Sequence, residues 1–447
     1  MQPEPPQSTA GESPAAAPVS RREIFSWAMF DFANSSYTTV VMTTIFNTYF
    51  VNVVASGQGG PKAGLATLLW TTAVAVSNLL VVLTAPVLGA FADHSAAKKQ
   101  LLAASTAACA ICTALLALTH AGTVPLAMAL IIVANFAYGT GENLIAAFLT
   151  EISSREKMGR ISALGLAIGY FGGPLVLSMC FVYIGWAQQH GQTQAQFVPA
   201  CMLMVAVTYA LAAAPTFLWL RERIVAEPMP PGKGLVELGF ERLMRTIGQA
   251  RRFQDLFRFL TTLVVLSCGT SAVIVLAAIY AQQVIGFSSR ETVAVILVVN
   301  VTAAAGAFIF GHVQDKIGSV KTLIITLSLW TLAIALACFI TSKLEFWVIA
   351  LMIGVAMGST QSTARALIGQ FSPLKRSAEF FGLWGLAVKF ASIIGPMSFG
   401  LISFITSGNQ RLAILSTACF FLAGLVLMTT VNEERGKAAA LTGDAGS

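Results

Sequence analysis

Residues 89–99 read Gly-Ala-Phe-Ala-Asp-His-Ser-Ala-Ala-Lys-Lys, and residues 311–321 read Gly-His-Val-Gln-Asp-Lys-Ile-Gly-Ser-Val-Lys. The two stretches share a glycine, an aspartate and a lysine, and the members of each pair lie 222 positions apart. The Gly-Pro pairs at residues 173–174 and 395–396 are separated by the same 222 positions. A fixed offset over so long a stretch indicates that the chain contains two copies of one unit.

The composition indicates that lipid, rather than water, surrounds most of the chain. Of the 447 residues, 56% are hydrophobic and only 11% are charged, whereas soluble globular chains carry about 25% charged residues. Backbone groups inside a bilayer cannot bond to water, so the spanning segments must be helices or a closed barrel. The apolar runs are continuous over the length of a membrane helix and do not alternate as barrel strands do. The sequence therefore predicts an all-α integral membrane protein.

Twelve spans are predicted, six in each copy of the repeat. The first six are Ile24–Val54, Thr67–Ala92, Gln100–His120, Thr123–Thr150, Gly159–Ala187 and Phe197–Leu220. The second six are Phe257–Val284, Thr292–Gln314, Val320–Thr341, Phe346–Gln370, Phe380–Ile405 and Leu412–Val431. Two copies of six helices in the same order form the parallel-repeat architecture of secondary transporters.

Around these spans, the chain is divided into five parts. Residues 1–20 are predicted to be a disordered tail, 21–220 the first six-helix bundle, 221–255 a linker, 256–431 the second bundle and 432–447 a polar tail. In the linker, Phe240, Leu243, Met244 and Ile247 have helical spacing among several arginines. This pattern fits an amphipathic helix on the membrane surface. A solvated linker that only joins the two bundles is the alternative.

Lysine and arginine predict the orientation. Of the 27 such residues, 21 fall in the tails and in the loops on the same side as the tails, and 4 fall on the other side. Because cytoplasmic loops carry the excess of these residues, both termini are predicted to be cytoplasmic. The net charge of +7 is thereby explained by topology, and nucleic acid is not an expected partner.

The repeated Gly-x-x-x-Asp…Lys loop resembles the signature loop of the major facilitator superfamily. Three further stretches resemble one branch of it, the vacuolar effluxer-like branch named for an autophagy-linked amino-acid effluxer. They are Ser26–Phe50, Gly159–Pro174 and Lys375–Pro396, with the motifs FDFANS and RSAEFFG in the first and third. The resemblance implies a transporter with two six-helix bundles and a central cavity lined by the first, fourth, seventh and tenth helices. The chain departs from the branch at residues 266–269, where Leu-Ser-Cys-Gly replaces an acidic motif.

Four charged residues lie deep inside the predicted spans: Asp31, Glu142, Arg365 and Lys389. A charge near a helix centre costs roughly 2.5–3.5 kcal/mol on the insertion scale, so each is a candidate functional residue. Both acids lie in the first bundle and both bases in the second. If the bundles pack as the resemblance implies, these charges face one another across the bundle interface.

Two interpretations of the four charges remain open. In the first they bind a zwitterionic substrate, the acids holding its cationic group and the bases its anionic group. In the second they pair with one another as gates and do not contact substrate. The acids are also candidates for proton coupling, because a carboxylate whose basic partner moves away changes its affinity for a proton.

Polar neighbours extend this candidate site. Asn34 shares a face of the first span with Asp31, Asn143 is the repeat equivalent of Arg365, and Gln361 lies one turn from Arg365. We expect these amides to line the cavity, with hydrogen bonding between helices as the alternative for Asn34.

Gate contacts are predicted where the two repeated loops meet the opposite bundle. Asp93 is expected near Arg376 and Asp315 near Arg160, with Lys99 and Lys321 in the same loops, because an acid is stabilised at a helix N-terminus. Gly165, Gly169 and Gly173 recur every fourth residue, and we expect this face to pack across the bundle interface.

No cofactor, metal site or enzymatic centre is predicted, because the four histidines show no ligand spacing and no nucleotide-binding loop is present. The expected function is a monomeric secondary transporter, driven by protons, that exports a small polar or zwitterionic solute such as an amino acid. The setting is a bacterial inner membrane, with lipid as the other partner. The alternatives are a transporter of larger amphiphiles, with Met29, Phe46, Trp384 and Phe390 lining its cavity, and a non-transporting membrane sensor or scaffold.

Overall fold

The computed structural model describes residues 19–56, 64–95, 97–153, 158–223, 234–251, 253–372 and 377–445, and all regular structure within them is helical. The first half contains α1 (Arg21–Tyr37), η1 (Thr38–Thr44), α2 (Phe46–Tyr49), η2 (Phe50–Val54), α3 (Leu65–Ser95), α4 (Lys98–Leu115), η4 (Leu116–Leu118), α5 (Val124–Ile152), α6 (Met158–Gln189) and α7 (Gln194–Trp219). The second half contains α9 (Gln254–Gln283), α10 (Ser289–Ile317), α11 (Ser319–Ala337), α12 (Lys343–Phe371), α13 (Ser377–Ile405) and α14 (Gln410–Met428). Two further helices, α8 (Leu235–Ala250) and α15 (Glu433–Ala445), follow the first and second halves.

The twelve-span prediction agrees with this arrangement. Within the described residues, eleven helices are long and apolar enough to cross a membrane. The remaining span is the first, where α1 continues through η1, α2 and η2 as a chain of shorter helical segments. The segments η1 and η2 are π-helical. The η1 sequence is rich in Thr and Val, whose β-branched side chains crowd an α-helix, and the Thr43 hydroxyl bonds to the Thr39 carbonyl at 2.8 Å.

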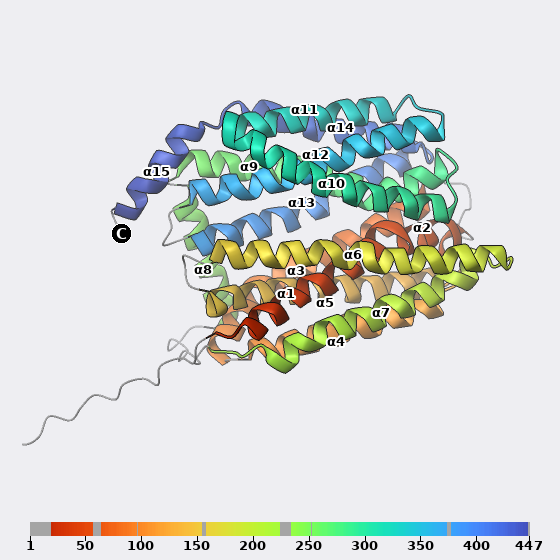
Figure 1. Cartoon of the computed structure of the whole chain (residues 1–447), viewed down its shortest axis with the longest axis horizontal. Helices are drawn as coiled ribbons and strands as arrows, with labels where there is room; N and C mark the ends of the chain where they lie inside the picture. The colour runs from red at the N-terminus through yellow and green to blue at the C-terminus, as the bar shows by residue number, and fades with distance from the viewer. Residues whose placement is uncertain are drawn as a thin grey trace, which may run out of the picture.

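The packing of the helices follows the sequence repeat. In the first half α1 packs on α6 and α7, and in the second half the equivalent α9 packs on α13 and α14. The pair α3 and α5 has its counterpart in α10 and α12. Figure 1 shows the two halves side by side, red to yellow-green and green to blue, with α8 and α15 at one end of the bundle. We call this end the termini end, because α1 begins and α15 ends there, and the other the opposite end.

The glycines of α6 occupy a different interface from the one expected. A Cβ atom on Gly165 would lie 2.5 Å from the Trp27 ring, and one on Gly169 would lie 3.2 Å from the Cβ of Asp31. These glycines therefore bring α6 against α1 inside the first half, and the prediction that they pack across the bundle interface is wrong. The reason is that α6 meets the second half on another face, where Gly185 contacts Arg290 of α10.

The segments outside the spans also contain helices. The amphipathic pattern in the linker forms α8, as predicted. The C-terminal segment, expected to be only a polar tail, forms α15. Most of the N-terminal tail, residues 1–18, lies outside the described residues.

Gly165→Val should destabilise the protein, because the new side chain collides with Trp27, and overpacking of this kind costs about 1–3 kcal/mol. The measurement is the melting temperature of purified protein in detergent. Gly89→Val is the matched control, since nothing lies within 4 Å of a Cβ atom at Gly89. Equal melting temperatures for the two variants would contradict the close packing of α1 and α6.

Candidate functional site

An ion pair joins the two halves part-way along the spanning helices. The Lys389 Nζ of α13 lies 2.5 Å from the Glu142 Oε2 of α5. The Lys389 side chain is 18% exposed and the Glu142 side chain is 42% exposed. The pair therefore lies at the edge of an accessible space between the halves, as expected for charges that line a cavity.

The other two predicted charges also face each other across the interface. Asp31 of α1 interacts electrostatically with Arg365 of α12 and with Glu142. The guanidinium of Arg365 lies 5.4 Å from the centre of the Trp384 ring on α13. Gly165 and Gly169 leave room for Asp31 between α1 and α6. The site thus contains two acids from one half and two bases from the other.

Two tyrosines that the sequence analysis did not select complete the site. The Lys389 Nζ lies 5.1 Å from the centre of the Tyr138 ring, a distance at which the ring face attracts a cation. The hydroxyl of Tyr170 on α6 donates to the Gln361 Oε1 of α12 at 3.4 Å, which is a second contact between the halves. Tyr138 could have been selected from the sequence, because it lies one helical turn before Glu142 and therefore on the same face of the helix.

The predicted amides separate into different environments. Gln361 is exposed and contacts the other half. Asn143 is exposed and lines a cavity of about 180 Å³ together with Gly89, Lys98 and Thr140. Asn34 is only 6% exposed.

The amide of Asn34 is bonded inside the first half, where its Oδ1 accepts from the Tyr209 hydroxyl at 3.4 Å. That contact matches the alternative expectation, a hydrogen bond between helices. Phe46, expected to line the cavity of an amphiphile transporter, is fully buried and packs against Trp70. Its ring therefore belongs to the core of the first half and does not line a cavity.

The halves are joined at the opposite end by a chain of uncharged amides. Gln410 Nε2 donates to Gln283 Oε1 at 2.8 Å, and Gln283 Nε2 donates to Asn52 Oδ1 at 3.1 Å. Asn52 Nδ2 donates in turn to Gln282 Oε1 at 2.8 Å. Gln410 also donates to the hydroxyl of Thr67 at 3.2 Å. Because Asn52 and Thr67 belong to the first half and the three glutamines to the second, three of these four hydrogen bonds cross the interface.

Further contacts between the halves lie at the same end. The Asn47 Nδ2 of α2 donates to the Val275 carbonyl of α9 at 2.9 Å. The Gln194 Nε2 of α7 donates to the Ser289 hydroxyl of α10 at 2.6 Å. Among the described residues, no hydrogen bond or ion pair joins the two spanning bundles at the termini end. The polar contacts that join the halves among the described residues therefore lie at the opposite end or part-way along the spanning helices.

The predicted gate residues belong to the loops at the termini end. The side chains of Asp93 and Arg160, and the whole of Arg376, lie outside the described residues. Asp315 and Lys321 are exposed, and neither makes an ion pair with any residue that the structure describes. Their contacts were expected in the state that closes the termini end, so the gate assignment stays a prediction.

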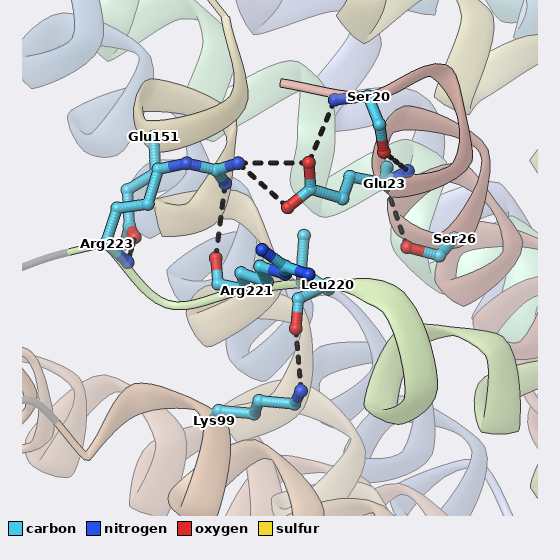
Figure 2. Close-up of polar contacts among 8 residues, drawn as sticks. All are labelled: Ser20, Glu23, Ser26, Lys99, Glu151, Leu220, Arg221 and Arg223. Carbon is cyan, nitrogen blue, oxygen red and sulfur yellow. Dashed lines mark hydrogen bonds and ion pairs between the residues drawn. The ribbon is translucent and has the colours of Figure 1, made fainter. Parts of the chain in front are cut away.

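Lys99 has a defined role within the first half. Figure 2 shows its Nζ donating to the carbonyl of Leu220, the last residue before the linker, at 2.6 Å. In the same cluster, Arg223 forms two bonds to the carboxylate of Glu23, at 2.9 and 3.0 Å, and its backbone N–H donates to Glu151 at 2.8 Å. These contacts tie the start of α1 and the end of α5 to the segment that leaves α7.

The second half repeats this arrangement with different residues. Arg435, after the last span, forms two bonds to the carboxylate of Asp255 at the start of α9, at 2.5 and 2.7 Å. Glu433 accepts from the Val320 N–H at the start of α11 at 2.9 Å. Burial raises the pKa of Glu433, but hydrogen bonds from Lys437 and the Val320 N–H outweigh it, so the pKa lies below its ordinary value. Each half is thus held together at the termini end by its own charged contacts.

Within the described residues, no group of three or more His, Cys, Asp or Glu side chains could hold a metal ion. The charged side chains at the interface are paired with each other or lie against aromatic rings.

Comparisons with known proteins agree with this geometry. Residues 66–441 match the family model described as "Vacuole effluxer Atg22 like". An uncharacterized MFS-type transporter, YxiO, from Bacillus subtilis is 25% identical over 92% of this chain and 94% of its own length. Autophagy-related protein 22-1 from Aspergillus niger is 24% identical over 68% of this chain and 52% of its own. The chain thus spans about half the length of this fungal relative.

Solved structures share the fold at low sequence identity. The D-xylose-proton symporter matches with a TM-score of 0.65 and 16% identity, covering 93% of this chain and 99% of that one. The nucleoside transporter NupG matches with a TM-score of 0.65 and 13% identity, over 92% of this chain and 98% of that one. At such identities the likeness establishes the architecture of two six-helix bundles.

Gln410→Leu should shift the protein toward the state that is open at the opposite end. The variant leaves the oxygens of Gln283 and Thr67 without their donor, which costs roughly 1–3 kcal/mol for a buried polar group. The measurement is the distance distribution between spin labels at the exposed residues Ala121 and Leu344, one on each half. We expect a longer-distance population to grow.

Gln188→Leu is the matched control, because Gln188 is exposed and its side chain forms no hydrogen bond to the described residues. If Gln410→Leu and Gln188→Leu give the same distance distribution, the amide chain does not hold the opposite end closed.

Proposed function

Since this chain belongs to the vacuole effluxer Atg22-like family of the major facilitator superfamily, we propose that it is a secondary transporter of small zwitterionic solutes, with amino acids first. The observation that supports this substrate class is the Glu142–Lys389 pair, which joins the halves beside Asp31 and Arg365. The site offers two acids on one side and two bases on the other. A solute with both an ammonium and a carboxylate can replace these internal partners without leaving a charge unpaired.

The proposed cycle is alternating access. We take the opposite end, where the amide chain joins the halves, to be the closed end, and the termini end to be the open one. The excess of Lys and Arg on the termini side supports a cytoplasmic location for that end, which makes this the inward-facing state. Substrate then enters from the cytoplasm, takes the place of the ion pair between Glu142 and Lys389, and leaves at the opposite end. We propose export across a bacterial plasma membrane by a monomer with both termini inside.

Protons are the proposed coupling ion. Glu142 is the candidate carrier, because its carboxylate meets a base only when the two halves bring Lys389 to it. When the halves move and Lys389 withdraws, the carboxylate loses its ion-pair partner, and a proton can neutralise it in place of the ammonium group. Asp31 is less accessible, lying between α1 and α6, and we assign it to holding Arg365 and the cationic group of the substrate.

A transporter of larger amphiphiles is the competing function. Phe390 is 47% exposed and can offer an apolar surface to an amphiphile, which supports this function. Phe46 does not support it, because its side chain is buried. A non-transporting scaffold is a further alternative, but such a protein gains nothing from the insertion cost of four deep charges. The two experiments below separate these functions.

An amino acid should raise the melting temperature of the purified wild-type protein and leave Lys389→Ala unchanged. A ligand at 100 times its Kd stabilises the folded state by about 2.7 kcal/mol through mass action. The screen covers the common amino acids, small carboxylates, lysolipids and drugs. Lys343→Ala is the control, since this lysine pairs with Glu291 away from the site and should retain the shift. Stabilisation by lysolipids or drugs alone would favour the amphiphile transporter.

Glu142→Gln should abolish transport driven by a proton gradient in proteoliposomes and preserve exchange of substrate across the membrane. The neutral amide keeps the shape of the side chain but cannot gain or lose a proton. Uptake of the amino acid found in the screen measures proton-driven transport, and counterflow of the same amino acid measures exchange. Proton-driven transport at the wild-type rate would show that Glu142 is not the coupling residue.

A further inference from the structure

The linker helix α8 packs on α3 through one face. Gly239 brings the two backbones together, because a Cβ atom at this position would collide with the carbonyl of Pro86. Leu238, next to it, is 8% exposed. α8 also contacts α13 of the second half. The helix is therefore fixed against the bundle and touches both halves.

A neighbouring face of α8 is apolar and uncovered. Val236 is 59% exposed and Met244 is 61% exposed. Phe240, Leu243 and Ile247 lie on the same side of the helix at helical spacing and are partly exposed. Glu241 and Arg245 lie on the other side and form an ion pair at 3.1 Å, and Glu237 is exposed at the edge of the stripe. The helix thus has three faces: one on the protein, one apolar and one charged.

The depth of α8 identifies what covers the apolar face. Pro86 lies five residues before the end of the candidate span Leu65–Phe91, which is about 7.5 Å at 1.5 Å per residue. Interfacial helices bury their apolar face about 5–10 Å into the boundary between headgroups and acyl chains. Figure 1 places α8 at the termini end of the bundle. Its uncovered stripe therefore lies at the depth of a membrane surface.

α8 contacts α3 and α13 at the end of these helices where their glycines are less closely packed. Near the opposite end these two helices touch closely: a Cβ atom on Gly64 would lie 2.6 Å from the Ser403 carbonyl oxygen, and one on Gly400 would collide with Thr71. Toward the termini end, Gly89 of α3 and Gly382 of α13 have no neighbour within 4 Å of such an atom. The backbones at these two positions are thus free of the close contacts that Gly64 and Gly400 make near the opposite end.

We propose that α8 lies in the lipid headgroup region at the termini end, with its apolar stripe against acyl chains, and covers the opening between α3 and α13. In this position it keeps lipid out of the charged central space while that space is open to water. Lipid beside Glu142 and Lys389 would remove the water that solvates them, and unsolvated charges are costly. Arg251, exposed just after α8, adds a cation at the level of lipid phosphates.

Nitroxide labels in lipid nanodiscs test the membrane contact. Single cysteines replace Val236 or Met244 on the stripe, and Glu241 or Arg245 on the charged face as matched controls, with the exposed Cys419 replaced by serine. We expect the stripe labels to collide several-fold more often with oxygen, which enriches in lipid, than with a water-soluble nickel chelate. The control labels should show the reverse. If the labels at Val236 and Met244 collide more often with the nickel chelate than with oxygen, the proposal is overturned and α8 is a solvated linker.

A second label tests the covering role. A nitroxide at Gln361, in the space between the halves, should collide with oxygen several-fold more often when Val236→Asp and Met244→Asp are combined, because the charged stripe leaves the membrane. Glu237→Ala combined with Arg245→Ala is the control and should not change the collision rate. Size-exclusion chromatography verifies that each variant is folded. An unchanged rate at Gln361 in the folded double-aspartate variant would overturn the covering role.

Discussion

The cost of placing charged side chains in a bilayer is the constraint on which the rest of this structure depends. Asp31, Glu142, Arg365 and Lys389 can be accommodated only if each meets a partner or water. The two bundles solve this jointly, because the acids belong to one and the bases to the other. Neither bundle alone satisfies its deep charges. The interface between them is consequently where a charged solute can compete with internal partners.

The two ends of the bundle are held together by different chemistry. At the opposite end, neutral amides join the halves through hydrogen bonds that carry no net charge. At the termini end, the ion pairs Glu23–Arg223 and Asp255–Arg435 act within single halves. The charged contacts at the termini end therefore act within each half, whereas the hydrogen bonds between the halves at the opposite end are neutral. In the proposed alternating access, the halves can part at the opposite end without separating charges there.

Much of the site could be predicted because membrane charges are rare and therefore conspicuous. Four of them in helices that should line a cavity pointed to the interface, and the structure brings them together there. Asn34 could not be placed, because a small amide is equally stable facing a cavity or bonded to a neighbour such as Tyr209. The hydrogen bonds of Gln283 and Gln410 could not be predicted for a related reason. Amide side chains are common at helix ends, and only the distances between them in the structure show that they join the two halves.

The sequence by itself determined the class of protein, the two copies of six helices and the four deep charges, because hydropathy and the 222-residue offset are properties of the chain alone. Only the tertiary structure decided which surfaces meet. The glycines of α6 face α1 rather than the second half, Lys389 pairs with Glu142, and the amides of Gln283, Gln410 and Asn52 join the halves at the opposite end. The physical reason is that helix periodicity specifies which residues share a face, whereas the partner of that face depends on how whole helices pack.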